Sequence, residues 1–148
     1  DDLSEYGNVI SENASFELSS KEPRWNKEED HKYLLSSDEG HPGFAFCTEY
    51  KTNQWVTIDL GEERNIKAMM IRNSDGDRRS DGIQTYISND GDSWEKIWEP
   101  DMWDQEWFFP VTHFHAGINV LGRKARFVKI EQPKLNILAL SHLKIYGD

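Results

Sequence analysis

The segment Arg72–Gly82 carries side chains of the types that a polar recognition site needs. It contains three arginines among asparagine, serine and aspartate residues, in a chain with a formal net charge of −10. A guanidinium group donates two aligned hydrogen bonds, so it suits a pair of hydroxyl groups, a carboxylate or a sulfate. The alternative is a solvated turn in which the aspartates of the segment neutralise its arginines. The sequence leaves both interpretations open.

The segment Trp98–Pro110 is rich in aromatic rings. Flat aromatic faces stack on the C–H faces of sugar rings and lose little entropy when they bind. The alternative is an additional pair of strands that seals the fold and buries the rings. We expect most of the rings to be buried and at least one of three to be exposed: Trp103, Trp107 or Phe108.

Trp25 stands in the polar segment 21–32, where it has no apolar partner at a strand or helix period. Its ring either is exposed or covers one end of the fold. Arg24 lies beside it, and His41 and Glu49 are weaker candidates for a polar contact with a ligand.

A transition-metal site is not expected from the histidines. His113 and His115 are two residues apart, so they face the same side of a strand, but a site needs at least one more ligand. No cysteine or acidic residue stands at a metal-motif spacing from this pair.

The composition narrows the functional classes. The acidic charge repels nucleic-acid phosphates and anionic lipids, so we expect neither a nucleic acid nor a membrane surface as the partner. The single cysteine, Cys47, excludes an internal disulfide, and the flanking Phe44 and Phe46 favour a buried thiol. The sequence has no nucleophile elbow, no phosphate-binding glycine loop and no zincin helix. A pair of catalytic carboxylates stays open among so many acidic residues, but we expect a protein that is not an enzyme.

Several short runs have the period of two that marks half-buried strands. Glycine, asparagine and aspartate turns separate them, with Asn89–Asp92 as a strong tight-turn signal. Short strands at a spacing of about ten residues predict an all-β fold, an antiparallel β-sandwich (jelly roll), in one domain over residues 1–148. The predicted strands are Ala14–Leu18, Trp55–Leu60, Ile66–Ile71, Ile83–Ser88, Trp94–Trp98, Ala125–Ile130 and Leu140–Tyr146, with a turn at Gly61–Asn65.

These runs resemble the discoidin family, also known as coagulation factor V/VIII C-type domains, whose fold is galactose-binding-like. The matching pieces are Trp55–Gly61, Ile66–Ile71, Tyr86–Trp94, Arg123–Ile130 and Ala139–Gly147. Their order and spacing agree with the family over nearly the whole chain. The resemblance implies a discoidin-like jelly roll, but it does not fix the ligand, because one fold hosts many functions.

The resemblance also implies where a ligand would bind. In sugar-binding members of the family, the loop that corresponds to Arg72–Gly82 brings an arginine and an asparagine or aspartate to the ligand. We therefore combine this loop with the aromatic and polar candidates described above. The residues assigned to the ligand site are Arg72, Asn73, Arg78, Arg79, Asp81, Trp103, Trp107, Phe108, Trp25 and His41.

A structural calcium ion is the one cofactor that the resemblance suggests. Members of the family often hold it with a loop near an Asp-Gly pair and with a glutamate of the last strand. Ser37 and Asp38 are weak candidates for such a loop. The glutamate position corresponds to His142, whose neutral imidazole is a poor ligand for a hard cation.

Together these features predict a non-catalytic carbohydrate-binding module that recognises a glycan through loops at one end of the sandwich. An anionic glycan, uronate or sulfated, would match the arginines. The alternative is a protein-interaction or adhesion module, as many discoidin domains are. The segment Gly43–Tyr50 resembles bacterial discoidin-like domains found with polysaccharide-handling enzymes. We accordingly expect a secreted, periplasmic or cell-surface location, and a monomeric module of a larger exported protein.

Overall fold

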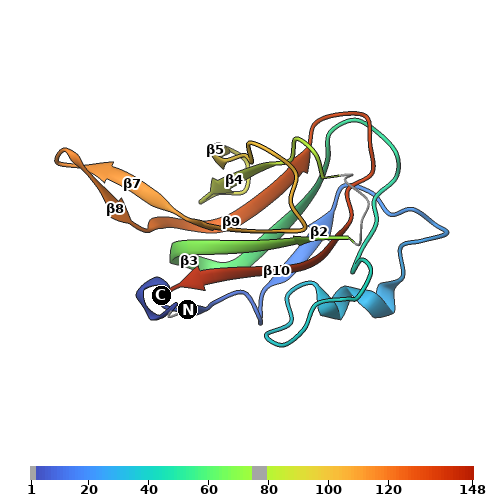
Figure 1. Ribbon diagram of the computed structural model, residues 1–148, viewed down its shortest axis with the longest axis horizontal. Coiled ribbons are helices and arrows are strands. Elements are labelled where there is room, and N and C mark those ends of the chain that lie inside the picture. Colours follow the sequence, from blue (N-terminus) through green and yellow to red (C-terminus); the bar gives the residue numbers. More distant parts are fainter. Residues whose placement is uncertain (1–2, 75–79) are drawn as a thin grey trace.

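The protein is an antiparallel β-sandwich, as predicted (Figure 1). The computed structural model describes residues 3–74 and 80–148, and every strand pair in these ranges is antiparallel. No helix in the same ranges is long and apolar enough to cross a membrane. The elements are η1 (Ser4–Tyr6), β1 (Asn8–Val9), β2 (Ser15–Leu18), η2 (Glu28–Tyr33), β3 (Gln54–Asn73), β4 (Gln84–Ser88), β5 (Glu95–Trp98), β6 (Glu106–Pro110), β7 (Thr112–His115), β8 (Ile118–Leu121), β9 (Arg123–Gln132) and β10 (Leu140–Gly147).

The long strand β3 belongs to both layers of the sandwich. Its first half pairs with β2 and β9, and its second half pairs with β10 and β6. The ladder with β9 is irregular between Asp59 and Arg64. Gly61 has a φ of 89°, a conformation that glycine adopts without strain. The predicted turn at Gly61–Asn65 is therefore wrong: the chain bends there without leaving the sheet, and the two strands predicted on either side are one.

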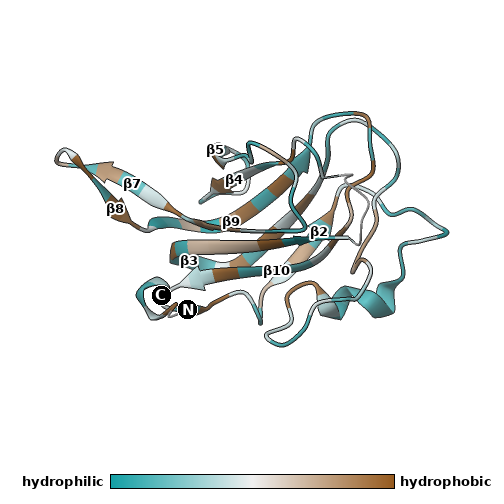
Figure 2. Ribbon diagram, viewed as in Figure 1, coloured by the Kyte–Doolittle hydropathy of each residue, from teal (hydrophilic) through white to brown (hydrophobic). Residues whose placement is uncertain are grey.

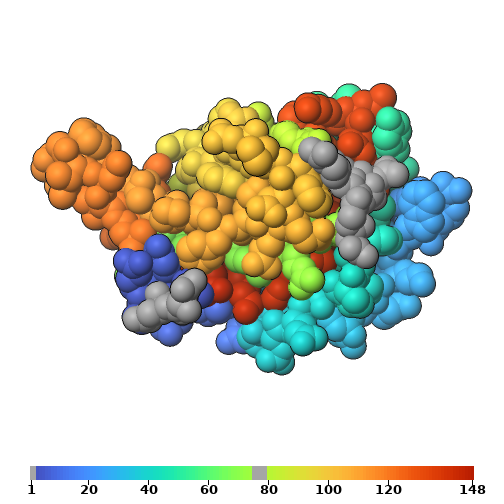
Figure 3. All heavy atoms as spheres, in the orientation of Figure 1, coloured from blue at the N-terminus to red at the C-terminus, as the bar shows by residue number. Residues whose placement is uncertain are grey.

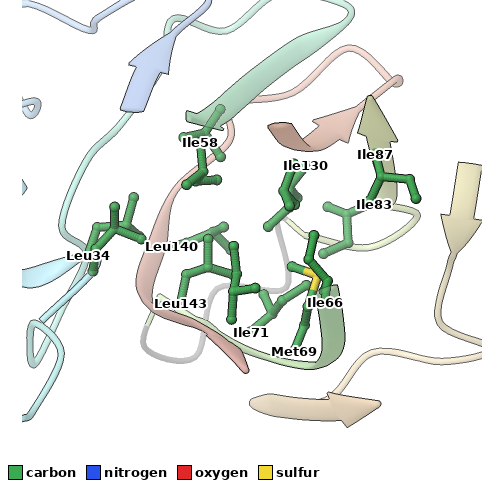
Figure 4. Packing of buried hydrophobic residues seen from close by; sticks show 14 of the residues in the cluster. Leu34, Ile58, Ile66, Met69, Ile71, Ile83, Ile87, Ile130, Leu140 and Leu143 are labelled. Carbon is green, nitrogen blue, oxygen red and sulfur yellow. The ribbon is translucent and has the colours of Figure 1, made fainter. Parts of the chain in front are cut away.

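Inward side chains from both layers form the core. The alternation of polar and apolar residues along β9 and β10 is visible in Figure 2. In Figure 4, Ile58 and Ile130 of one layer point toward Ile71 and Leu143 of the other, and all four have 0% exposed area. Burial of each such side chain contributes about 1.5–3 kcal/mol, so the two layers are held together mainly by these contacts.

Two different segments cover the outer edge of β10. The short strand β1 pairs with its last residues, where Asn8 lies opposite Gly147. Along the first half of β10, residues 34–45 take this place: Leu34 O accepts a hydrogen bond from Leu143 N, and Ala45 N donates to Leu140 O, both at 2.8 Å. The segment 36–43 is thereby fixed beside the outer face of β10.

The connections and the chain ends lie at opposite ends of the molecule. In Figure 1, the connections of residues 19–27, 44–53 and 133–139 lie at the right, whereas both chain ends lie at the left.

The pattern of the sequence does not predict β6, β7 or β8. β6 lies in the aromatic segment Trp98–Pro110 and pairs with β3. The segment therefore adds one strand, and not the pair that the alternative interpretation expected, and Trp107 and Phe109 of this strand are buried. β7 and β8 pair with each other and lie outside the larger sheet. The predicted strands that correspond to β2, β4, β5, β9 and β10 are confirmed to within a few residues.

Leu143→Ala should lower the free energy of unfolding by about 3 kcal/mol, because it leaves a cavity between the two layers. Leu135, which is 56% exposed, provides the control: Leu135→Ala should change stability by no more than about 0.5 kcal/mol. Urea denaturation followed by tryptophan fluorescence measures both. Equal effects of the two variants would contradict the assignment of Leu143 to the core.

Candidate functional site

A pocket of about 600 Å³ lies where β3, β6 and β10 meet the segment 38–42. The strand register places Arg72 of β3 between Glu106 of β6 and His142 of β10. Lys144 and Tyr146 follow His142 on the same face of β10, because side chains of a strand alternate with a period of two. The pocket is thus built on the outer face of one layer, along β10.

The pocket places hydrogen-bond donors beside acceptors over a partly apolar floor. Arg72 and Lys144 supply the donors, Glu106 supplies an acceptor, and Met70 and Tyr146 supply apolar surface. Fixed cations and carboxylates at strand spacing can hydrogen-bond neighbouring hydroxyl groups of one ligand. The arrangement suits a ligand that carries both hydroxyl groups and C–H faces.

His41 is brought to the rim of this pocket, as its assignment requires. Its Nδ1 accepts a hydrogen bond of 2.8 Å from the backbone N of Gly43, and its Nε2 lies 3.4 Å from Asp30 Oδ2. Its ring also meets the edge of Tyr33. These contacts hold the imidazole in one orientation.

Asn73 points to the opposite face of β3 from Arg72. It is buried, and its Nδ2 donates to the backbone O of Asp104. Gln105 returns the contact, since its Nε2 donates to Asn73 O at 2.9 Å. Asn73 therefore fastens the connection between β5 and β6 to β3 and does not face the pocket.

The two tryptophans of the aromatic segment that were assigned to the ligand site, Trp103 and Trp107, pack inward. Trp107 is buried, meets Trp98 edge-on and donates from Nε1 to Met102 O at 3.3 Å. Trp103 is half-buried and packs against the core. Both rings therefore support the fold, and Trp107 has no free face for a ligand.

Phe108 is the ring of this segment that reaches the outer surface. It is 40% exposed, which confirms that one of the three named rings is exposed. Its ring packs edge-on against Tyr6 and Tyr146, with centroids 5.2 and 5.8 Å away. Because Tyr146 lines the pocket, Phe108 extends the apolar surface beside it.

Trp25 is exposed on the connection between β2 and η2 and does not line the pocket. The Arg24 guanidinium lies 4.7 Å from its ring centroid. Asn26 ties this connection to the body, because its Oδ1 accepts a hydrogen bond from Cys47 N. Cys47 itself is buried, as predicted. Trp25 is therefore an exposed ring that lies apart from the pocket, on a connection that a hydrogen bond holds to the rest of the domain.

Asp81 lies next to β9, where its backbone O accepts a hydrogen bond of 2.8 Å from Gln132 Nε2. Two further assigned residues, Arg78 and Arg79, lie outside the residues that the structure describes. The described candidates that gather in one place are thus Arg72, His41 and, beside them, Phe108.

The residues suggested for calcium do not fit that ion. His142 Nε2 donates to Ser36 O at 2.8 Å, so the imidazole itself ties the loop to β10. Asp38 contributes its backbone N to a hydrogen bond with Ser36 Oγ. Among the described residues, no group of three histidine, cysteine or acidic side chains is placed to hold a metal ion. A hard cation needs several oxygen ligands, which Ser37, Asp38 and His142 do not assemble.

Sequence analysis missed Glu106, Lys144 and Tyr146 as pocket residues. Lys144 and Tyr146 do carry a signal, because they alternate with the buried Leu143 and Ile145. Their position next to Arg72 depends on strand register, which the alternation does not give.

A model of the F5/8 type C domain matches residues 14–139. No match was found among curated protein sequences. A fucose-binding module of Streptococcus pneumoniae superimposes with a TM-score of 0.74 at 12% identity, covering 96% of each chain.

Two further solved structures have a TM-score of 0.68. CpGH89CBM32-5 of Clostridium perfringens, in complex with GalNAc-β-1,3-galactose, is 16% identical and covers 95% of this chain and 100% of its own. A chitosan-binding module of a Paenibacillus chitosanase/glucanase is 14% identical and covers 95% of this chain and 99% of its own. These likenesses show that the fold is shared.

The opposite roles of Arg72 and Asn73 predict opposite effects on stability. Asn73→Ala should lower the free energy of unfolding by about 1–3 kcal/mol, because it removes a buried side chain and its hydrogen bond to Asp104 O of the β5–β6 connection. Arg72→Ala removes an exposed side chain and should stay within about 0.5 kcal/mol of the wild type. Urea denaturation compares the two, and a larger loss for Arg72→Ala would contradict the placement.

Acidification should destabilise the protein through His142. Burial lowers the pKa of its ring in the folded state, and the nearby cations Lys144 and Arg72 act in the same direction, against the hydrogen bond to Ser36. The unfolded chain keeps the ordinary pKa of about 6.5, so it binds more protons below that pH and the free energy of unfolding falls.

His142→Gln keeps a donor for Ser36 O and removes this titration, so stability should depend less on pH below about 6.5. Denaturation midpoints between neutral and mildly acidic pH measure the slope, with the exposed His115→Gln as the matched control. Burial also lowers the pKa of His31, so this residue accounts for the dependence of stability on pH that remains in His142→Gln. An unchanged slope in His142→Gln would contradict the prediction.

Proposed function

Because the chain belongs to the F5/8 type C (discoidin) family, we propose that it is a non-catalytic module that binds a glycan. The observation that carries the proposal is the pocket in which Arg72 stands between Glu106 and His142, with Lys144 on the same face of β10 and the aromatic surface of Tyr146 and Phe108 beside it. The similar modules from S. pneumoniae, C. perfringens and Paenibacillus, which bind or hold sugars, support this ligand class.

The pocket would hold one sugar ring by its hydroxyl groups. Arg72 and Lys144 donate to hydroxyl oxygens, and Glu106 accepts from hydroxyl hydrogens. A C–H face of the ring packs against Tyr146 and Met70. The site is open and shallow, so a single contact is weak and several linked copies raise the overall affinity.

The described charges favour a neutral glycan over an anionic one. Two cations, Arg72 and Lys144, face three carboxylates, those of Asp38, Glu39 and Glu106, which gives a formal sum of −1. An anionic glycan would have to draw on Arg78 and Arg79. Binding of uronate and sulfated polysaccharides, compared with binding of neutral ones, therefore tests the expectation of an anionic glycan.

The wider setting follows from the same proposal. Residues 1–148 would act as one module of a secreted, periplasmic or cell-surface protein of a bacterium, and the attached protein would supply any catalysis. Trp25, exposed on its own connection, would contact a glycan that extends beyond the pocket.

Arg72→Ala should weaken glycan binding about tenfold, because it removes a pair of charge-assisted hydrogen bonds. Arg64→Ala serves as the matched control: its Nε donates to Asp148 O near the chain end, and Arg64 does not line the pocket. A glycan array with neutral, uronate and sulfated sugars identifies the ligand, and calorimetry then measures the affinity of each variant.

The proposal fails if the folded wild type binds no glycan. Equal losses of glycan affinity in Arg72→Ala and Arg64→Ala would contradict the assignment of binding to this pocket. Incubation with the bound glycan, followed by product analysis, tests the non-catalytic role, because turnover would contradict it.

A further inference from the structure

β7 and β8 form a hairpin arm, residues 112–121, that projects from the sandwich (Figures 1 and 3). In the described ranges its strands pair with each other and with no strand of either layer. All side chains of β7 are exposed, Phe114 to 72%, and Ile118 of β8 is 62% exposed. A lone two-stranded hairpin is marginally stable in water, so such an arm gains stability from a contact.

The arm is preformed at both ends. At its root, the buried Val111 donates from N to Lys67 O at 2.8 Å and accepts from Gly122 N at 2.7 Å. At its tip, Ala116 and Gly117 have φ values of 51° and 85°, as the two central residues of a type I′ turn require. Binding through the arm therefore costs little ordering of the chain.

The arm carries no charge that would keep other molecules away. Residues 107–122 contain no Asp, Glu, Lys or Arg, although these residues make up 30% of the chain. Exposed strands are normally protected from pairing by charged residues, proline or a cover. On a protein with a net charge of −10, an uncharged arm is also where two copies can meet without apposing carboxylates.

A hollow of about 550 Å³ lies at the base of the arm, with a mostly apolar wall that includes Val120 and Leu121. Val120 pairs with His113, and Ile118 pairs with His115, so Ile118 and Val120 share one face of the hairpin. Ile118 is the knob near the tip of this face, and the hollow begins about 7 Å away, two residues along the strand.

We propose that the arm is the contact of a homodimer, in which Ile118 of each copy packs into the hollow beside Val120 of the other. A two-fold contact requires that one surface be complementary to itself. A knob and a hollow at opposite ends of one hairpin face meet this requirement when two arms pack antiparallel. This proposal replaces the monomer expected from the sequence.

The size of the arm sets the strength of the dimer. Two hairpins of this length bury less than about 1,200 Å², so the dimer is weak, with a dissociation constant on the order of 100 µM. The arm projects on the side of the chain ends, away from the connections (Figure 1). If the proposed glycan function holds, the dimer leaves both pockets open and binds two sugars at once.

Sedimentation velocity of the wild type, from about 10 µM to about 1 mM, should show a reversible monomer–dimer equilibrium. Ile118→Asn should raise the dissociation constant at least about tenfold, because it removes the knob. Phe114→Ser is the matched control: Phe114 is as exposed but points to the opposite face, so the dimer should persist. Higher salt should strengthen the wild-type dimer, because it screens the repulsion between the acidic copies.

A wild type that stays monomeric throughout this range at high salt would overturn the proposal. So would a Phe114→Ser variant that dissociates as far as Ile118→Asn. Circular dichroism checks that the variants are folded. We expect both to fold, because Phe114 and Ile118 are exposed. This assay contains no glycan. A monomeric wild type would therefore leave the proposed glycan function unaffected, and a lack of glycan binding would leave the proposed dimer unaffected.

Discussion

The rest of the structure depends on the four hydrogen-bonded ladders that β3 makes along its length. Its first half is held between β2 and β9, and its second half between β10 and β6. The bend at Gly61 turns one strand into a covalent link between the layers. A single strand therefore positions core side chains of both layers and the polar groups at its end.

A second constraint is the alternation of side chains at the end of β3. It directs Arg72 outward to the pocket and Asn73 inward to the connection that precedes β6. Asn73 thus helps to place β6, and β6 supplies Glu106 to the pocket beside Arg72. Two neighbouring residues of one strand thus serve the same site in different ways: Arg72 faces the pocket, and Asn73 positions the strand that supplies Glu106.

Much of the sandwich could be predicted from the sequence, since the strands that became β2, β4, β9 and β10 alternate clearly. The site could be predicted only in part. Glu106 and His142 flank Arg72, and Lys144 lies opposite Met70, because of long-range register, which local alternation does not contain. Trp107 illustrates the same limit. The sequence of an aromatic segment is the same whether its rings face solvent or a core, and here distant strands complete the core that buries Trp107.

The pairing of Asn8 with Gly147 has a consequence for how such a fold can be joined to other chains. Paired strands lie about 5 Å apart, so the polypeptide enters and leaves the sandwich at almost the same point. A host protein could accept the fold within a surface loop with little separation of the residues on either side. For the same reason a short linker could join the two ends, and new termini could be opened in a connection at the far end of the sandwich.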